Sequence, residues 1–202
     1  MTALEWLQLA GIGAVALGVL YVIVRWMLKE SAMFPETAKK YGITFTHEKQ
    51  GGLLSNVSDV RRLRGVAMGT PIEVVATYQT RGRMRMRSTV LASPALAGLP
   101  ACTMNILRQP PAANVHLVPT GDAQFDAKRW VTSDTPAAVR AVITPAARTA
   151  LLRCPHDELR LVIKDGHFIL GLPGTPMNQA ELHGLIDAVL ALPRNTPRNA
   201  TT

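Results

Sequence analysis

The segment from Arg61 to Ala92, RRLRGVAMGTPIEVVATYQTRGRMRMRSTVLA, decides the fold of this chain. Two runs rich in apolar and β-branched residues, 61–68 and 71–79, flank the dipeptide Gly69-Thr70, and a third run over 83–92 follows the next turn. Short runs of this kind separated by turn residues are typical of hairpin-connected strands. The segment therefore predicts a meander of antiparallel strands.

The rest of the chain adds elements around this meander. Alternating residues predict strands over 43–47 and 102–109, and a hairpin over 158–172 turns at an Asp-Gly pair. Two short helices over 135–154, each opened by a Thr cap and a Pro, form a helical insert. A final amphipathic helix over 175–192 presents an apolar face made of Leu182, Leu185, Ile186, Val189 and Leu190. The predicted fold class of this part is α+β, an antiparallel-sheet domain with a helical insert and a closing C-terminal helix.

An apolar run precedes this domain. Residues 7–24 contain no charged side chain, and a run of about 18 or more apolar residues is typical of a membrane-spanning helix. Trp6 and Trp26 are twenty residues apart in the sequence, which in a helix is about 30 Å, and Arg25 is placed to snorkel. A cleaved signal peptide would need a basic segment before the run, which the sequence lacks. We therefore expect a transmembrane helix over 6–28, with these three residues as interface anchors.

The flanking charges predict the orientation of this helix. No Lys or Arg precedes it, whereas Arg25, Lys29, Lys39 and Lys40 follow, so the positive-inside rule places the C-terminal part in the cytoplasm. The predicted organisation is a short extracytoplasmic N-terminus (1–5), the transmembrane helix, a juxtamembrane helix (29–42), a cytoplasmic α+β domain (43–192) and a disordered tail (193–202). The predicted location is the bacterial inner membrane, as a single-pass protein. A net charge of +8 suits the anionic inner leaflet.

One face of the predicted transmembrane helix is made of small residues. Ala10, Ala14 and Gly18 recur every four residues, and Gly11 lies beside them. Small residues at this spacing let a second membrane helix approach closely. They predict a partner helix, although Gly and Ala are also common in helices that face only lipid.

A basic run follows the predicted strand over 71–79. Arg81, Arg83, Arg85 and Arg87 alternate with small or apolar residues, so a strand would place all four on one face. They predict contact with an anionic surface, namely lipid phosphate, an acidic partner protein or the domain's own carboxylates. A merely solvated basic face is the alternative. Nucleic acid is disfavoured because the run has no aromatic residues for stacking.

The segment 120–136 concentrates aspartates around two aromatic residues. Asp122, Asp126 and Asp134 could do acid–base work, and a hydrolase or metal enzyme using the first two is one hypothesis. However, each has a local structural task in a turn or a helix cap, with Phe125 and Trp130 as buried anchors. We predict a structural motif and no catalytic residues.

A second cluster of polar residues, RCPHDE over 153–158, carries four side chains that could ligate a metal. These are Cys154, His156, Asp157 and Glu158. No second ligand cluster stands at the spacing of a zinc site, and the remaining histidines are scattered. We predict no metal and no cofactor.

The motif region also resembles an uncharacterised group of bacterial membrane-anchored proteins. In that group a Gly-Asp, Phe-Asp and Val-x-Ser-Asp pattern precedes a Leu-Thr-Pro helix start. The matching residues here are Gly121, Asp122, Phe125, Asp126, Val131, Ser133, Asp134, Thr144 and Pro145. Ile143 and Trp130 depart from the usual residues. The resemblance implies a membrane-tethered α+β domain and implies no activity.

These observations favour a non-catalytic accessory subunit. We expect it to be anchored in a membrane and to dock through its cytoplasmic domain on a larger membrane protein complex, for which respiratory and photosynthetic assemblies are natural hosts. The alternative is a tethered module that binds anionic lipids at the inner leaflet.

Overall fold

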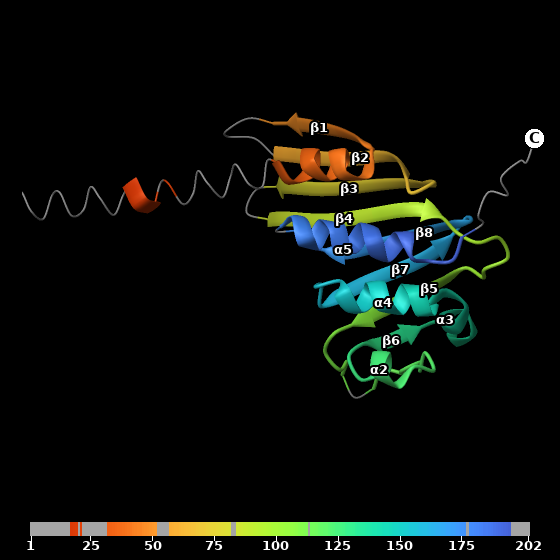
Figure 1. The fold of residues 1–202 in the computed structure, drawn as a ribbon. Coiled ribbons are helices and arrows are strands. Elements are labelled where there is room, and N and C mark those ends of the chain that lie inside the picture. Colours follow the sequence, from red (N-terminus) through yellow and green to blue (C-terminus); the bar gives the residue numbers. More distant parts are fainter. Residues whose placement is uncertain are drawn as a thin grey trace, which may run out of the picture.

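A computed structural model describes residues 17–19, 21, 32–51, 57–81, 84–112, 114–176 and 178–194. The described part contains one antiparallel eight-stranded sheet in the order β1-β2-β3-β4-β8-β7-β5-β6 (Figure 1). The strands are β1 (Thr44–Gln50), β2 (Val57–Ala67), β3 (Thr70–Arg81), β4 (Met84–Pro94), β5 (Cys102–Leu107), β6 (Trp130–Ser133), β7 (Glu158–Lys164) and β8 (His167–Pro173). Residues 17–19 and 21 are helical, and the helices of the sheet domain are one over residues 32–41, which we call the first helix, α2 (Ala123–Asp126), α3 (Pro136–Val142), α4 (Pro145–Arg153) and α5 (Gln179–Leu190).

The predicted meander is confirmed as strands β2, β3 and β4. The β2–β3 turn is one residue earlier than the sequence predicts, because Met68 and Gly69 both have positive φ and Ala67 pairs with Thr70. Positive φ at both central residues is the signature of a type I′ hairpin turn, whose twist matches that of the strands. The β7–β8 hairpin repeats this arrangement at Asp165 and Gly166, as predicted.

The helices cover one face of the sheet and form the second layer of the domain. In Figure 1 the first helix lies over β2 and β3, α5 over β4 and β8, and α4 over β7 and β5. Alternate residues of the central strands are buried under them, as in β7, where Leu159, Leu161 and Ile163 point into the core. The closing helix α5 buries the same apolar face that the sequence predicts. The apolar residues between the two layers form the core.

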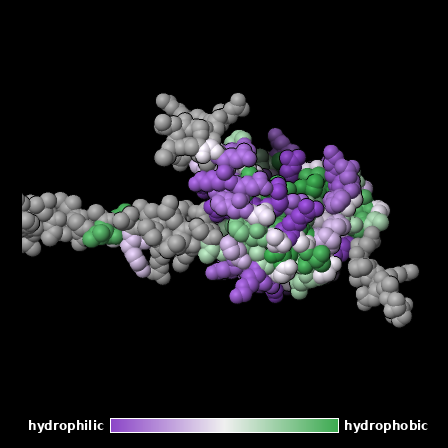
Figure 2. All heavy atoms as spheres, turned by 90° about the horizontal axis from the view of Figure 1, so that it is seen from above, coloured by the Kyte–Doolittle hydropathy of each residue, from purple (hydrophilic) through white to green (hydrophobic). Residues whose placement is uncertain are grey.

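Strand β1 forms one edge of the sheet, and its side chains are mostly exposed. Seen from that edge, the molecule is mainly hydrophilic, with smaller hydrophobic patches (Figure 2). Charged side chains on an edge strand discourage pairing with a second molecule. At the other edge, the N–H of Val118 donates to the carbonyl of Val131 in β6 at 2.8 Å.

The predicted transmembrane helix over 6–28 requires a correction. No helix in the described ranges is long and apolar enough to cross a membrane. Of the predicted span, the structure describes only 17–19 and 21, which are helical, and the rest lies outside the described residues. The prediction of an anchored, single-pass inner-membrane protein is wrong for the part of the chain that the structure describes.

The sequence predicts a juxtamembrane helix over 29–42, and the structure describes a helix over 32–41 that packs on the sheet. Met33, Phe34 and Ala38 belong to the hydrophobic core. Gly42 ends the helix with a φ of 66°, in the left-handed region that favours glycine. This helix is therefore part of the sheet domain.

Candidate functional site

The uncovered face of the sheet is the first candidate surface. Residues that alternate with the core positions lie on this face, and among those whose burial the structure describes, none is buried. We refer to this side of the sheet as the uncovered face. Its centre is apolar and is built from small or β-branched residues. Its central residues are Val75, Val90, Ala92, Val162, Ile169 and Gly171.

The strand register aligns these residues into rows that cross the sheet. One row runs from Arg62 through Val75, Val90 and Gly171 to Arg160, each residue being the Cα partner of the next. Five neighbouring strands span about 19 Å at roughly 4.8 Å per step. The row therefore places an arginine at each end. The three residues between them, Val75, Val90 and Gly171, span about 10 Å, which is close to the roughly 10–12 Å diameter of an α-helix with its side chains.

The cations along this face differ in how they are paired. Arg62 lies 3.6 Å from a carboxylate oxygen of Glu48 and 3.2 Å from one of Glu73. Arg64, Arg160 and Lys164 are exposed, and none has a carboxylate partner among the described residues. The uncovered face thus combines an apolar centre with unneutralised positive charge at its rim.

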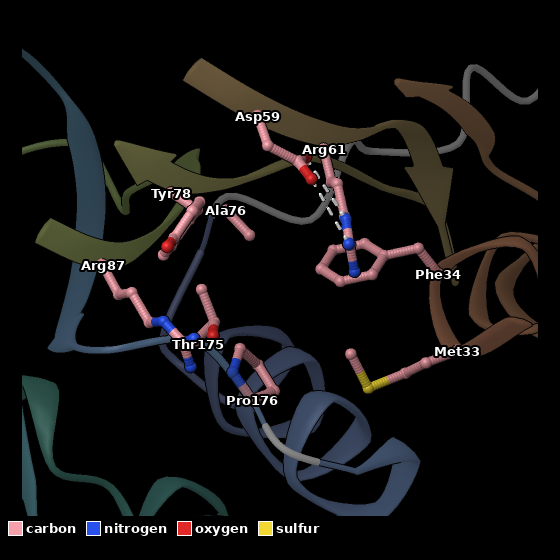
Figure 3. A pocket seen from close by; sticks show the side chains of 9 residues that line it. All are labelled: Met33, Phe34, Asp59, Arg61, Ala76, Tyr78, Arg87, Thr175 and Pro176. Atoms are coloured by element: carbon pink, nitrogen blue, oxygen red, sulfur yellow. Dashed lines mark hydrogen bonds and ion pairs between the residues drawn. The ribbon is translucent and has the colours of Figure 1, made fainter. Parts of the chain in front are cut away.

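A pocket on the opposite, helix-covered face is the second candidate site (Figure 3). It lies between the first helix, the ends of β2, β3 and β4, and the loop before α5, and its volume is about 200 Å³. We call it the arginine pocket. Its lining residues are Met33, Phe34, Asp59, Arg61, Ala76, Tyr78, Arg87, Thr175 and Pro176.

Two arginines flank this pocket in different environments. Arg61 lies 3.4 Å from Asp59, and its guanidinium carbon is 5.7 Å from the ring centre of Phe34. Asp59 also lies 3.1 Å from Nε2 of His47. Arg87 instead stacks over the ring of Tyr78 at 5.1 Å, and no carboxylate in the described part of the chain pairs with it. Figure 3 shows Arg61 with Phe34 on one side of the pocket and Arg87 with Tyr78 on the other.

This arrangement separates the arginines that the sequence groups together. Arg87 pairs in register with Tyr78 in β3, and Arg85 pairs with Thr80. Arg81 is the last residue of β3, and Arg83 lies outside the described residues. Arg87 is thus the member of the predicted basic strand whose side chain the structure places at a pocket. Arg61, from the other end of the meander, was not predicted, because only the β2–β3 register brings it there.

The three aspartates of the 120–136 segment all accept hydrogen bonds from backbone N–H groups. Asp122 caps α2 by accepting from Gln124 and Phe125, and it lies 3.1 Å from Arg148. Asp126 accepts from the N–H and the hydroxyl of Thr120, at 3.1 and 2.8 Å. Asp134 accepts from the N–H of Thr103 at 2.9 Å. These contacts fix the turns around β6, and whether the aspartates have any further role stays untested.

The aromatic residues of this segment are placed unequally. Phe125 is fully buried, whereas Trp130 is half-buried at the start of β6, so it is not the buried anchor that the sequence suggests. The preceding residue, Arg129, is buried instead, with 2% of its surface exposed. A buried arginine between a lysine and a tryptophan carries no signal that sequence reasoning could have used.

Arg129 binds the C-terminal end of α4. Its guanidinium donates to the carbonyl of Leu151 at 3.0 Å, to that of His156 at 2.7 Å and to that of Cys154. The last carbonyls of a helix lack partners within the helix and carry the negative end of its dipole. Burial lowers the pKa of Arg129, and an arginine nevertheless stays protonated in proteins. Its planar fork therefore holds α4 against the loop that leads to β7.

The possible metal ligands of the 153–158 segment do not converge. Cys154 is buried, His156 is half-buried, and Asp157 and Glu158 are exposed. No group of three or more His, Cys, Asp or Glu side chains that could hold a metal occurs in the described ranges. Both cysteines are free and buried, and burial raises the pKa of each thiol. The buried Cys154 packs in the core, and the absence of a metal stays a prediction.

A polar cluster joins the first helix to α5. Nδ1 of His183 lies 2.9 Å from Nζ of Lys40, and Nε2 lies 3.3 Å from the hydroxyl of Thr37. Tyr41 donates to Asp187 at 2.8 Å, and burial with this contact raises the pKa of Tyr41. Lys40 can donate to Nδ1 only when that nitrogen is unprotonated. Burial and the charge of Lys40 lower the pKa of His183, while Asp187 opposes the shift.

This cluster predicts a loss of stability in mild acid. Because the pKa of His183 is lower in the folded than in the unfolded state, the unfolded chain binds the proton first as the pH falls below about 6.5. The free energy of unfolding should decrease from that pH downward, and His183→Gln should show a smaller decrease. His156, whose pKa burial also lowers, should contribute in the same direction, so the double variant with His156→Gln should show the flattest profile. Urea unfolding at about pH 8 and about pH 5 measures the effect. An equal decrease in the free energy of unfolding between these pH values in the wild-type protein and all variants would contradict the prediction.

The predicted small-residue face lies almost entirely outside the described residues. Of its members, Ala10, Gly11 and Ala14 are not described, and Gly18 has no heavy atom within 4 Å of where a Cβ would stand. Leu17 and Tyr21 beside it are exposed. The predicted anchors Trp6, Arg25 and Trp26 also lie outside. A partner helix at this face stays an untested prediction.

The fold is an antiparallel α+β sheet with one helical layer, and comparison with known proteins adds little to it. The chain matches no protein-family model and no curated protein. A crystal structure of the mycobacterial trehalose monomycolate transport factor A, TtfA, is similar with a TM-score of 0.45 and 16% sequence identity. The similarity covers 79% of this chain and 90% of that one. A likeness at this level carries no argument about activity, substrate or partners.

Proposed function

We propose that this protein is a non-catalytic accessory protein that docks on a larger assembly through the uncovered face of its sheet. The observation that carries the proposal is the apolar strip between Arg62 and Arg160. Arg62 is paired with Glu48 and Glu73, whereas Arg64, Arg160 and Lys164 at the rim have no carboxylate partner among the described residues. Apolar surface removed from water drives association, and a charged rim selects the partner. A non-catalytic role is supported by the backbone contacts that engage all three aspartates of the 120–136 segment.

The occupant that this surface fits is an amphipathic helix of an acidic partner protein. The centre of the strip is made of Val, Ala, Gly and Ile side chains, which leave a shallow surface between the strands. Acidic residues along the two sides of such a helix would meet the rim cations. A second copy of this chain is a poorer occupant, because each copy carries a formal net charge of +8 and the two rims would repel each other.

The test replaces Val90, at the centre of the uncovered face, with glutamate. The full-length protein is purified from its native source, and the stoichiometry of each co-purifying protein is measured by quantitative mass spectrometry. We expect the wild-type protein to co-purify with a stoichiometric partner. The amount of this partner recovered with Val90→Glu should be at least about tenfold lower, because a charge would be buried in an apolar contact. The same partner should be released from the wild-type protein as the salt concentration rises.

Val115→Glu is the matched control for this experiment. Val115 is exposed to a similar extent, 42% against 38% for Val90, and it lies in the loop between β5 and α2, away from the strip. It should retain the partner as the wild-type protein does. Equal retention by both variants, equal loss from both, or a wild-type protein that purifies without a stoichiometric partner would each contradict the proposal.

A further inference from the structure

The arginine pocket is separate from the uncovered face, because it lies under the helical layer on the other side of the sheet. Its volume of about 200 Å³ lies below the roughly 300–1,000 Å³ of pockets that enclose drug-sized ligands. That space accepts a charged head group with a few carbon atoms and is too small for a larger ligand as a whole. It therefore suits the end of a molecule whose remainder extends outward.

The pocket is polar on one side and apolar on the other. Met33, Phe34 and Ala76 are buried members of the hydrophobic core, and Pro176 adds apolar surface beside them. The polar side carries Arg61, Arg87, Asp59, Tyr78 and Thr175. A ligand that fills the space must satisfy both sides, because an apolar molecule would strip water from the arginine and a fully polar one would face the core residues.

The charges of the lining favour an anion. Asp59 is neutralised by Arg61 at 3.4 Å and contacts His47 at 3.1 Å, so its charge is balanced within the pocket wall. Arg87 has no carboxylate partner in the described ranges, and its stacking on Tyr78 holds the guanidinium plane while leaving its N–H groups to other acceptors. A guanidinium presents paired N–H donors that match the two oxygens of a carboxylate or a phosphate. The net charge of the lining side chains is thus +1, on Arg87.

From this geometry we infer that the arginine pocket binds the oxyanion head of an amphipathic small molecule, with Arg87 pairing the carboxylate or phosphate and Phe34, Met33 and Ala76 contacting the adjoining apolar segment. A fatty carboxylate and the phosphate of a lipid-like monoester share this chemistry. Arg61 has a different task, since its pairing with Asp59 and its position over Phe34 keep the wall of the pocket in place. The inference is independent of the docking function proposed above.

Titration calorimetry on the full-length protein tests the inference with four probes. Octanoate and octyl phosphate carry both the anion and the apolar segment, whereas acetate and inorganic phosphate carry the anion alone. We expect at least one of the two octyl probes to bind, and to bind more tightly than its short counterpart. The octyl probe that binds more tightly identifies the preferred head group, and both results agree with the inference.

Three variants separate the site from general electrostatic attraction. Arg87→Gln should lower the affinity for the tighter-binding octyl probe by about tenfold or more, since a charge-assisted pair is lost. Arg153→Gln changes the net charge equally at an exposed residue at the end of α4 and should leave binding unchanged. Ala76→Leu should abolish binding by filling the pocket without changing any charge. Circular dichroism and thermal unfolding verify that each variant is folded.

Several results would overturn the inference. If neither octyl probe binds, the pocket is not a binding site for such molecules. If the short and octyl probes bind with equal affinity, the apolar wall takes no part in binding. Equal affinity of the wild-type protein and folded Arg87→Gln, or an equal loss in Arg87→Gln and Arg153→Gln, would show that Arg87 is not the recognising group.

Discussion

Replacing Arg129 with alanine is expected to lower the free energy of unfolding by about 3–5 kcal/mol. The guanidinium donates to the carbonyls of Leu151, Cys154 and His156, and only 2% of the residue is exposed. Without it, these buried carbonyls lose their partner, and a cavity replaces the side chain. Urea unfolding followed by circular dichroism measures the change.

Two further variants identify the cause of this loss. Arg129→Lys keeps the positive charge, but a single ammonium cannot reproduce a planar fork that reaches three carbonyls, so we expect a loss of about 2–3 kcal/mol. Arg153→Ala removes an exposed arginine from the last turn of α4, the helix whose end Arg129 contacts, and should change the free energy of unfolding by less than about 0.5 kcal/mol. A loss below about 1 kcal/mol in Arg129→Ala would show that the helix end does not depend on this residue.

Local patterns predicted those parts of the fold that depend on neighbouring residues. The Asp165-Gly166 turn, the Thr144 cap and the apolar face of α5 are each written in a few consecutive residues, and the structure has all of them. The strand order could not be read in this way. Strand β4 pairs with β8, about eighty residues later, and no local pattern encodes that pairing.

The candidate sites depended even more on tertiary structure. Arg61 and Arg87 are far apart along the meander and meet at one pocket because β2 and β4 both pair with β3. The uncovered face also needs the sheet, because its rows cross strands taken from both halves of the chain. What the sequence did indicate is that Arg87 lies in a strand rich in cations. It could not indicate that Phe34, assigned to a membrane-proximal helix, would lie across the pocket from it.

Phe34 is the residue whose truncation should have the second large effect. It is 1% exposed, its ring centre is 6.0 Å from that of Phe45, and it lies under the guanidinium of Arg61. It thus joins the first helix to both β1 and β2. Phe34→Ala should cost about 3–5 kcal/mol of unfolding free energy, since a buried aromatic side chain is replaced by a cavity.

The pattern of this loss distinguishes a docked helix from a loosely attached one. If the helix over 32–41 is part of the domain, hydrogen exchange of its amides should accelerate in Phe34→Ala well before that of β3 and β4, because the helix loses its main apolar contact. Phe34→Leu retains much of the volume and should cost less than about 1.5–2 kcal/mol, and Glu36→Ala, on the exposed side of the same helix, should cost almost nothing. Unchanged stability in Phe34→Ala would mean that the sheet folds without this helix. In that case the arginine pocket would lack one wall for part of the time, and the affinity of its ligand would fall in proportion to the fraction of molecules with the helix in place.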